Sequence, residues 1–307
     1  MWKTVLFLIF TIIVVPIVTF KFDVPLTALQ QEALETLVWM YGIATLLTFI
    51  VSTITENYSQ VDKLWSIIPV PYVWTLAYYA GFEPRINVMA VLVTLWAARL
   101  TYNFGRRGGY AWKFWAGDED YRWAILRAKP EFQAKWKWMS FNLFFISAYQ
   151  MGLILLFTLP ALKAMGSSAP LVWLDYLLAT MMLGFIIMSF FADQQQYDYQ
   201  EEKHKQRKVG KVDDFHKIGF THTGLWAYFR HPNYAAEQSI WIVFYFFSVI
   251  ATGNWVNWSI AGCLLLVVLF KGSADFSEDI TAQKYPLYKK YIKEVGRFLP
   301  FKGKFKF

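Results

Sequence analysis

The stretch RHPNYAAE, residues 230–237, gathers several chemically capable side chains directly before a long apolar run. Pro232 lacks an N–H and fixes its own φ, so it predicts the first turn of a helix. Asn233 and Glu237 then stand four residues apart on one helix face. An amide that donates and a carboxylate that accepts match the two ends of a carboxamide, such as that of nicotinamide.

The alternative interpretation of this stretch is a polar cap at a membrane interface. In that case Arg230 and His231 contact lipid headgroups, while Asn233 and Glu237 satisfy the helix terminus. The position of Glu237 at the head of AAEQSIWIVFYFF favours a ligand site, because an unpaired carboxylate in an apolar run is costly and usually functional.

The elements that must position these residues are apolar helices. Of the 307 residues, 56% are hydrophobic, 20% are aromatic and only 17% are charged, whereas soluble domains have about 25% charged residues. We therefore expect an all-α fold: a polytopic membrane bundle of seven or eight transmembrane helices with cytoplasmic loops and a C-terminal tail. The apolar stretches lie at about 4–20, 36–54, 65–81, 86–104, 138–160, 171–191, 237–252 and 255–270.

Two of these stretches leave the number of spans open. The last pair is short and separated only by TGNW, which allows a helical hairpin that stops before the far interface. The first stretch could be a signal peptide, but no small-residue cleavage site follows it, so we expect a retained helix. No linker or repeat divides the chain, and we expect one membrane domain over 1–307, with residues 193–307 as its cofactor-binding half.

The basic residues predict the orientation in the membrane. Of 30 Lys and Arg, 24 fall in residues 105–137, 193–235 and 271–307, which follow alternate helices and so lie on one side. By the positive-inside rule this side is cytoplasmic. The expected location is the endoplasmic reticulum membrane in a eukaryote or the inner membrane in a bacterium, and the C-terminal tail can fold back over the other two segments.

Several common signatures are missing from the sequence. GRRGG at 105–109 has the wrong spacing for a Rossmann turn, and no Walker A loop occurs. The single cysteine, Cys263, and three loop histidines with no zinc spacing predict no metal site. The net charge of +8 is largely explained by the positive-inside bias, so we expect membrane lipids and an apolar substrate as partners, with no nucleic acid.

The motif FRHPNYAAE resembles the R-H-P-N-Y-x-x-E motif of the membrane steroid 5α-reductase and sterol reductase superfamily. The resemblance extends through QVDKLWSI (60–67), RLTYNFGRRGGYAW (99–112), DEDYRW (118–123), FADQQQYDYQ (191–200) and KYPLYKKY (284–291), and it is closest to a functionally uncharacterised branch. Isoprenylcysteine and phospholipid methyltransferases have a similar R-H-P-x-Y, followed by an acidic pair and a Y-x-x-Y tail. Glu278-Asp279 and Tyr288-x-x-Tyr291 fit that pattern as well.

The reductase resemblance implies NADPH bound inside the helix bundle from the cytoplasmic side, and reduction of a carbon–carbon double bond. Asn233 and Glu237 would hold the nicotinamide carboxamide with His231 and Tyr234 close by, and Asp193 would contact the adenosine half. Arg99, with Arg106 or Arg107 a few residues later, would contact phosphates or ribose. Lys271 stands where the family has an arginine, and the histidine and tyrosine that follow in the family are Asp275 and Asp279 here. This departure from the family pattern concerns the residues that would bind the adenine end of the cofactor.

The resemblance also implies a catalytic role for Asp62 in VDKLW, which stands 37 residues before Arg99, as the catalytic glutamate does in the steroid enzymes. Hydride addition to an enone builds charge on oxygen, and a buried carboxyl kept neutral could donate a hydrogen bond to it. The family's partner tyrosine is Trp96 here, so a 3-oxo-steroid substrate does not follow. Without the resemblance, Asp62 would pair with Lys63 at a helix start.

Three functions remain open at this point. The first is an NADPH-dependent reductase of an activated alkene in a steroid-like, isoprenoid or other lipid. The second is an S-adenosylmethionine-dependent methyltransferase of a lipid or prenylated substrate, which would use RHPNY and Glu278 and would not need Asp62 or Arg99. The third is a non-catalytic membrane scaffold that keeps the reductase fold, and Trp96 is a reason to retain it.

Overall fold

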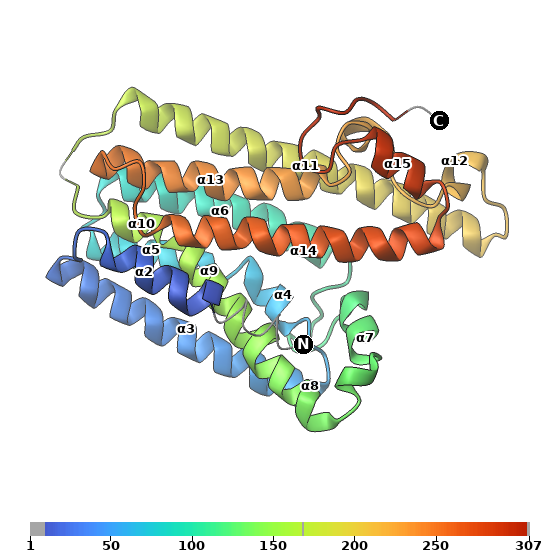
Figure 1. Cartoon of the computed structure of the whole chain (residues 1–307), viewed down its shortest axis with the longest axis horizontal. Helices are drawn as coiled ribbons and strands as arrows, with labels where there is room; N and C mark the ends of the chain where they lie inside the picture. Colours follow the sequence, from blue (N-terminus) through green and yellow to red (C-terminus); the bar gives the residue numbers. More distant parts are fainter. Residues whose placement is uncertain (1–9, 168, 306–307) are drawn as a thin grey trace. The chain divides into compact units, whose positions relative to one another are not determined.

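The computed structural model describes residues 10–167 and 169–305, and in these residues the regular structure is helical, in agreement with the predicted all-α fold (Figure 1). The first half of the chain contains η1 (Phe10–Val14), α2 (Val15–Lys21), α3 (Ala28–Thr55), α4 (Gln60–Trp65), α5 (Pro69–Tyr79), α6 (Pro84–Gly105), α7 (Tyr121–Arg127), η2 (Pro130–Phe132), α8 (Lys135–Phe141) and η3 (Asn142–Tyr149). The second half contains α9 (Gln150–Thr158), α10 (Pro160–Ala164), α11 (Trp173–Lys208), α12 (Asp214–Lys217), η4 (Gly224–Ala227), α13 (Pro232–Thr252), α14 (Ile260–Lys284) and α15 (Tyr288–Glu294).

Six helical segments of the described chain are long and apolar enough to cross a membrane. A 20-residue helix spans about 30 Å, the thickness of the hydrocarbon core. The sequence and the structure therefore agree on a multi-pass helical membrane protein. The six segments are Ala28–Thr55, Pro84–Gly105, Lys135–Ala164, Trp173–Lys208, Pro232–Thr252 and Ile260–Lys284.

The predicted span at 65–81 is wrong. This region is divided into the short helices α4 and α5, joined by a turn in which the N–H groups of Ile67 and Ile68 both donate to the carbonyl of Leu64. Pro69 and Pro71 begin α5, and neither residue has an N–H to continue a helix from the preceding turn. The 11 residues of α5 cover about 16 Å, roughly half of a hydrocarbon core.

The first predicted span and the last two also differ from the helices in the structure. The predicted span at 4–20 lies partly outside the described residues, which show η1 and α2 from Phe10 to Lys21. The last two stretches are full-length helices rather than a short hairpin, because α13 begins at Pro232 and α14 continues past its apolar part to Lys284. The Pro232 end of α13 and the Lys284 end of α14 thus carry the polar residues of the predicted site.

Residue contacts gather in two compact units, one made of residues 1–180 and 242–265 and the other of residues 181–241 and 266–307. Three helices, α11, α13 and α14, are divided between them. The prediction of one domain over 1–307, with 193–307 as its cofactor-binding half, stays a prediction.

The first unit is held together partly by polar contacts at helix ends. Thr27 and Gln30 form a reciprocal capping box at the start of α3, an arrangement that contributes about 1 kcal/mol to helix stability. The Gln30 amide also donates to the carbonyls of Leu162 and Met165. Arg85 and Asp175 form a buried two-pronged ion pair, with distances of 2.8 and 2.9 Å.

The second unit has its own hydrophobic cluster, built from segments far apart in the sequence. Ile218 and Phe220 pack against side chains of α15 and against the C-terminal Phe305. The Phe305 N–H also donates to the Ala227 carbonyl at 2.9 Å. The C-terminal tail therefore folds back over residues 215–230, within one of the two segments over which it was predicted to fold. The buried members of the cluster are Ile218, Phe220, Tyr288, Tyr291, Val295 and Phe305.

Candidate functional site

The predicted helix start at Pro232 is present, and it brings four polar residues together between α11 and α13. The Asn233 amide donates to the Asp193 carboxylate at 3.1 Å, and the Ser189 hydroxyl donates to Glu237 at 3.4 Å. Each pair joins residues four positions apart on the two helices, so the contacts form consecutive rungs between antiparallel helices. Asp193, Ser189 and Glu237 are buried, and Asn233 is half-buried. We call these four residues the polar ladder.

The orientation of Asn233 is fixed from both ends of its side chain. The amide oxygen accepts from the N–H of Tyr234 at 3.0 Å, and one amide hydrogen is donated to Asp193. An asparagine amide has two N–H bonds and two acceptor lone pairs, so each end keeps capacity for one further hydrogen bond. One helix turn away, Glu237 presents a carboxylate, and the ladder can therefore offer a donor and an acceptor along one face of α13.

Next to the polar ladder, Glu278 is surrounded by positive and donating groups. Its Oε1 accepts from Arg230 Nε at 2.8 Å and from His231 Nε2 at 3.0 Å, and its Oε2 accepts from Arg230 Nη2 at 3.3 Å and from Arg297 Nη2 at 2.7 Å. A carboxylate has about four acceptor positions, and all four are occupied. We call Arg230, His231, Glu278 and Arg297 the Glu278 clamp.

The surroundings of His231 favour its neutral form. Burial, together with the charges of Arg230 and Arg297, lowers the pKa of His231 below its usual value, although the Glu278 carboxylate acts in the opposite direction. The Nε2 atom carries the proton, because its partner is a carboxylate that can only accept. The imidazole ring lies nearly parallel to the ring of Tyr234, with 5.2 Å between centroids. The clamp thus fixes two of the predicted cofactor-binding side chains.

The main chain of the tail holds the same loop. The Arg230 N–H donates to the Gly296 carbonyl at 2.9 Å, and the His231 N–H donates to the Arg297 carbonyl at 3.1 Å. A Cβ atom at Gly296 would lie 1.8 Å from the Leu299 carbonyl oxygen, so only glycine fits there. The Tyr291 hydroxyl shares its single proton between the carbonyls of Trp226 and Phe229. The start of α13 is therefore positioned by residues 62 to 66 positions later in the sequence.

In the first unit, Asp62 lies in α4 and is half-buried. Its Oδ2 accepts from the indole N–H of Trp123 at 3.2 Å, and within the described residues it forms no ion pair. Burial and the neighbouring charge of Asp120 raise the pKa of Asp62, against smaller opposing effects of Arg122, Ser59 and Trp123. The carboxyl group is therefore biased toward its protonated form, in which it can donate a hydrogen bond.

The predicted alternative for Asp62, an ion pair with Lys63, is not what the structure contains. Lys63 is buried and donates instead to the carbonyls of Phe114 and Ala116, at 3.1 and 2.6 Å. Ser59 Oγ accepts from the Asp120 N–H at 2.9 Å. The segment that contains DEDYRW is thus anchored over α4, and this anchoring places Trp123 beside Asp62.

The remaining predicted residues lie in different settings. Arg99 is buried in α6, and Trp96, one turn earlier, is fully buried. Arg106 is half-buried, and its guanidinium donates to Asn103 Oδ1 at 2.8 and 3.0 Å. Lys271 is exposed and pairs with Asp275 at 2.9 Å. The second unit thus brings together five of the predicted residues: Asp193, His231, Asn233, Tyr234 and Glu237. Lys271 belongs to the same unit but is not part of this group.

Comparisons with known proteins place the chain in a family. Residues 48–295 match the family described as Protein of unknown function (DUF1295). The chain belongs to this family. It is 37% identical over 280 residues to the uncharacterized protein C594.04c of Schizosaccharomyces pombe, an alignment that covers 85% of this chain and 79% of the yeast protein. No solved structure matches.

For this DUF1295 protein the sequence did not point to three of the site's residues. Ser189 was missed because it is one serine in an apolar helix, and Trp123 because tryptophans are abundant in the chain. Arg297 was missed because it lies in a basic tail where the positive-inside bias already accounts for arginine. The recognisable signal for Trp123 was its place in DEDYRW, one of the motifs that supported the resemblance.

The residues that could ligate a metal are dispersed in the described part of this DUF1295 protein, where no group of three or more His, Cys, Asp or Glu is close enough to hold an ion. His216 binds Asp213 instead, at 2.8 Å from Nδ1 to Oδ1, and His222 Nδ1 lies 3.0 Å from the Phe220 carbonyl. Cys263 is buried in α14.

Asn257 lies in one of the two glycosylation sequons of the sequence. Its side chain is buried and donates to the Ser248 hydroxyl.

Proposed function

We propose that this protein is a membrane-embedded, NADPH-dependent reductase of a carbon–carbon double bond conjugated to a carbonyl group in an apolar, lipid-like substrate. The observation that carries the proposal is the polar ladder: Asn233 and Glu237 lie one turn apart on α13, and each is held from α11 by a side chain. The DUF1295 family is, on the motifs quoted above, similar to the steroid 5α-reductase superfamily, which supports the same activity.

The residues of the ladder fit a nicotinamide carboxamide. The Asn233 amide would donate its second hydrogen or accept at its oxygen, and Glu237 would accept from the carboxamide NH2. His231 and Tyr234, stacked beside Asn233, would line the neighbouring space. NADPH, when bound, supplies the hydride that reduces the alkene carbon. For the phosphates and the adenine end we propose Asp193 and Lys271 of the second unit, while the roles of Arg99 and Arg106, in the first unit, stay predictions from the resemblance.

Asp62 would act on the substrate rather than the cofactor. Burial and the charge of Asp120 raise the pKa of Asp62, which favours its protonated form, and Trp123 holds one oxygen in place. A protonated carboxyl can donate to the oxygen on which negative charge develops as the double bond is reduced. Trp96 is fully buried, so we assign the electrophilic role to Asp62 without a tyrosine partner.

The Glu278 clamp weighs against the methyltransferase alternative. That alternative needs Glu278 to hold S-adenosylmethionine, but all acceptor positions of this carboxylate are occupied by Arg230, His231 and Arg297. Tyr291, from the Y-x-x-Y tail, likewise bonds to main-chain carbonyls. The features shared with methyltransferases are thus engaged in holding the loop before α13.

The test is cofactor binding by purified protein in detergent. We expect NADPH to bind in the micromolar range and S-adenosylmethionine not to bind; the reverse pattern would overturn the proposal. Glu237→Gln should weaken NADPH binding about tenfold, the effect of losing one hydrogen bond to a charged group. Ser239→Ala, a change two residues later in the same helix, is the matched control. Equal affinities for the two variants would refute the carboxamide site.

A second experiment separates an enzyme from a scaffold. The protein is incubated with NADPH and lipid extracts, and lipids from cells with and without the protein are compared by mass. Turnover should appear as NADPH consumption and as a lipid pair that differs by two hydrogen atoms. NADPH binding with no consumption by any extract would favour a non-catalytic scaffold. The same comparison in fractionated cells would identify the membrane, which we propose to be the endoplasmic reticulum or a bacterial inner membrane.

A further inference from the structure

The loop between α6 and α7 exposes three large aromatic side chains within four positions. Residues 111–115, with the sequence AWKFW, are exposed throughout. The accessible fractions are 104% for Trp112, 70% for Phe114 and 42% for Trp115. Single apolar residues are common on protein surfaces, whereas a contiguous apolar group indicates an interaction site. We call residues 109–117 the aromatic loop.

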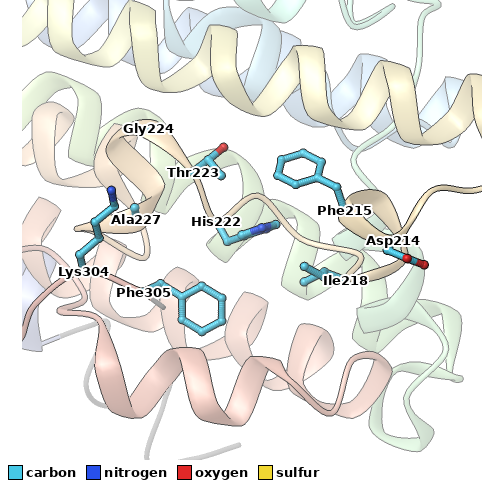
Figure 2. A pocket seen from close by; sticks show the side chains of 9 residues that line it. All are labelled: Asp214, Phe215, Ile218, His222, Thr223, Gly224, Ala227, Lys304 and Phe305. Atoms are coloured by element: carbon cyan, nitrogen blue, oxygen red, sulfur yellow. The ribbon is translucent and has the colours of Figure 1, made fainter. Parts of the chain in front are cut away.

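The aromatic residues around the cavity of about 350 Å³ in the second unit are arranged differently. There the rings pack against one another, with 4.8 Å between the centroids of Phe215 and His222 and 5.8 Å between those of His222 and Phe305. Figure 2 shows the His222 ring between the two phenylalanines. These rings cover one another, so the second unit leaves them little need of a partner. The side chain of Trp112, in contrast, is uncovered.

The aromatic loop is closed at its base. The Asp118 N–H donates to the Gly108 carbonyl at 2.8 Å. Gly117 has φ +117°, and an added Cβ would lie 2.5 Å from the Gly109 carbonyl oxygen, so only glycine fits there. This base lies three residues after Gly105, the last residue of α6. The loop is therefore a compact projection directly beyond the end of a membrane-spanning helix.

Two side chains of α4 hold the aromatic loop in its outward orientation. Lys63 is only 4% exposed, and its ammonium donates to the carbonyls of Phe114 and Ala116 at 3.1 and 2.6 Å. Its third contact is Gln60 Oε1 at 3.3 Å, and the Gln60 amide donates to the Trp115 carbonyl at 2.8 Å. Three consecutive carbonyls are thus turned toward α4. An ammonium has three N–H donors, so the buried charge is fully used in fixing the loop.

The position and the charge of the segment around the loop indicate which partner covers it. Residues 105–137 join the membrane-spanning segments Pro84–Gly105 and Lys135–Ala164, so both ends of the segment lie at the membrane. The segment contains eight Lys and Arg against four Asp and Glu, and Lys113, in the middle of AWKFW, is exposed. Tryptophan is enriched at membrane interfaces, and anionic headgroups attract nearby basic residues.

We propose that the aromatic loop inserts into an anionic membrane leaflet, with Trp112 and Phe114 at the boundary of the acyl chains and Lys113 among the headgroups. The partner is an anionic phospholipid. Because Lys63 and Gln60 tie the loop to α4, insertion also fixes the depth of the helix that carries Asp62. The surface is independent of the cofactor, so its absence would leave the proposed reductase untouched.

The test measures the depth of spin labels attached to the full-length protein. Cys263, the single cysteine of the sequence, is changed to Ala, and a nitroxide is attached to Trp112→Cys or Phe114→Cys. The protein is reconstituted in phosphatidylcholine bilayers with and without phosphatidylserine. Power saturation then compares the collisions of each label with oxygen, which concentrates among the acyl chains, and with a water-soluble nickel chelate.

With phosphatidylserine present, both labels should collide mainly with oxygen. The control label is Lys208→Cys, because α11 continues 16 residues past Ala192, about 24 Å beyond its apolar part, and this label should collide mainly with nickel. Lys113→Gln should lower the equilibrium constant for insertion about fivefold, the loss of about 1 kcal/mol expected for one basic residue near an anionic surface. Lys208→Gln should not change it.

Four results would overturn the proposal. Labels in the loop that meet nickel as often as the label at position 208 would show that the loop lies in water. Equal insertion with and without phosphatidylserine would show that anionic lipid is not the partner. Dipolar broadening between labels would identify a second copy of this chain as the occupant. A label that is immobilised but meets neither oxygen nor nickel would identify a protein contact instead of lipid.

Discussion

Two carboxyl groups, the half-buried Asp62 and the buried Glu278, are held in opposite ways. Glu278 receives hydrogen bonds from Arg230, His231 and Arg297, and its acceptor positions are filled. Asp62 receives one from the neutral indole of Trp123, and the nearby Asp120 adds a negative charge that raises its pKa. Both residues lie in motifs that the sequence singles out, yet their surroundings differ in charge.

This difference separates a structural carboxylate from one suited to chemistry. Pairing with cations favours the charged form of Glu278 and fixes it, so that it has no proton to donate and its lone pairs are not available to a ligand. Burial beside another carboxylate disfavours the charged form of Asp62 and leaves a proton that can be shared. The same residue type thus stabilises a loop in one region and is poised to act on a substrate in the other.

Glu278→Ala should have the largest effect on stability. The change leaves the buried guanidinium of Arg230 without its partner, and breaking a buried ion pair in this way costs about 3–5 kcal/mol. We expect a marked fall in the thermal midpoint or loss of folded protein, measured by intrinsic fluorescence in detergent. Asp279→Ala, at the exposed neighbouring position, should behave like the original protein. An unchanged midpoint for Glu278→Ala would mean that the clamp does not hold the loop.

Asp62→Asn should have the largest effect on turnover. An amide can still donate weakly but cannot supply the proton of a carboxyl group, and removal of such a group costs about 100-fold in rate. NADPH binding should be retained. The folded-state pKa of Asp62 is raised, so its contribution to stability falls as pH rises, and the variant should be at least as stable at pH 7. Full activity would exclude the catalytic assignment.

The extent to which the sequence predicts these two regions differs for physical reasons. The face shared by Asn233 and Glu237 was predictable, because helix periodicity and Pro232 are local properties. Their partners on α11, and the contact of Arg297 with Glu278, depend on which helices and tails pack together, and no local pattern specifies that. The division of the predicted span at 65–81 into two helices was missed because the prediction relied on the hydropathy of the segment. Its two prolines lack the N–H groups that a continuous helix needs, and they divide the segment.

The pH dependence of turnover should report the charge beside Asp62. If the protonated carboxyl is the active form, activity falls as pH rises through its raised pKa. Asp120→Asn removes the negative charge that raises this pKa, so the falling limb should move to lower pH. The control is Asp118→Asn, which lies in the same segment but is exposed and does not influence Asp62. If the falling limb of the pH–activity curve stays in place or moves to higher pH in Asp120→Asn, a group other than Asp62 controls the activity.

Lys271→Gln should produce the smallest effect and so defines the outer limit of the site. Its ion pair with Asp275 is exposed, with 68% and 44% of the two side chains accessible, and exposed pairs contribute about 0.2–1 kcal/mol at most. We therefore expect an unchanged thermal midpoint and, if Lys271 contacts a cofactor phosphate, a loss of about threefold in NADPH affinity that disappears at high salt. The measurement is a pair of NADPH titrations at low and high ionic strength, with Lys289→Gln, another exposed lysine of the second unit, as the control. Identical affinities at both salt concentrations would remove Lys271 from the proposed cofactor site and leave the polar ladder as the proposed edge of that site on α13.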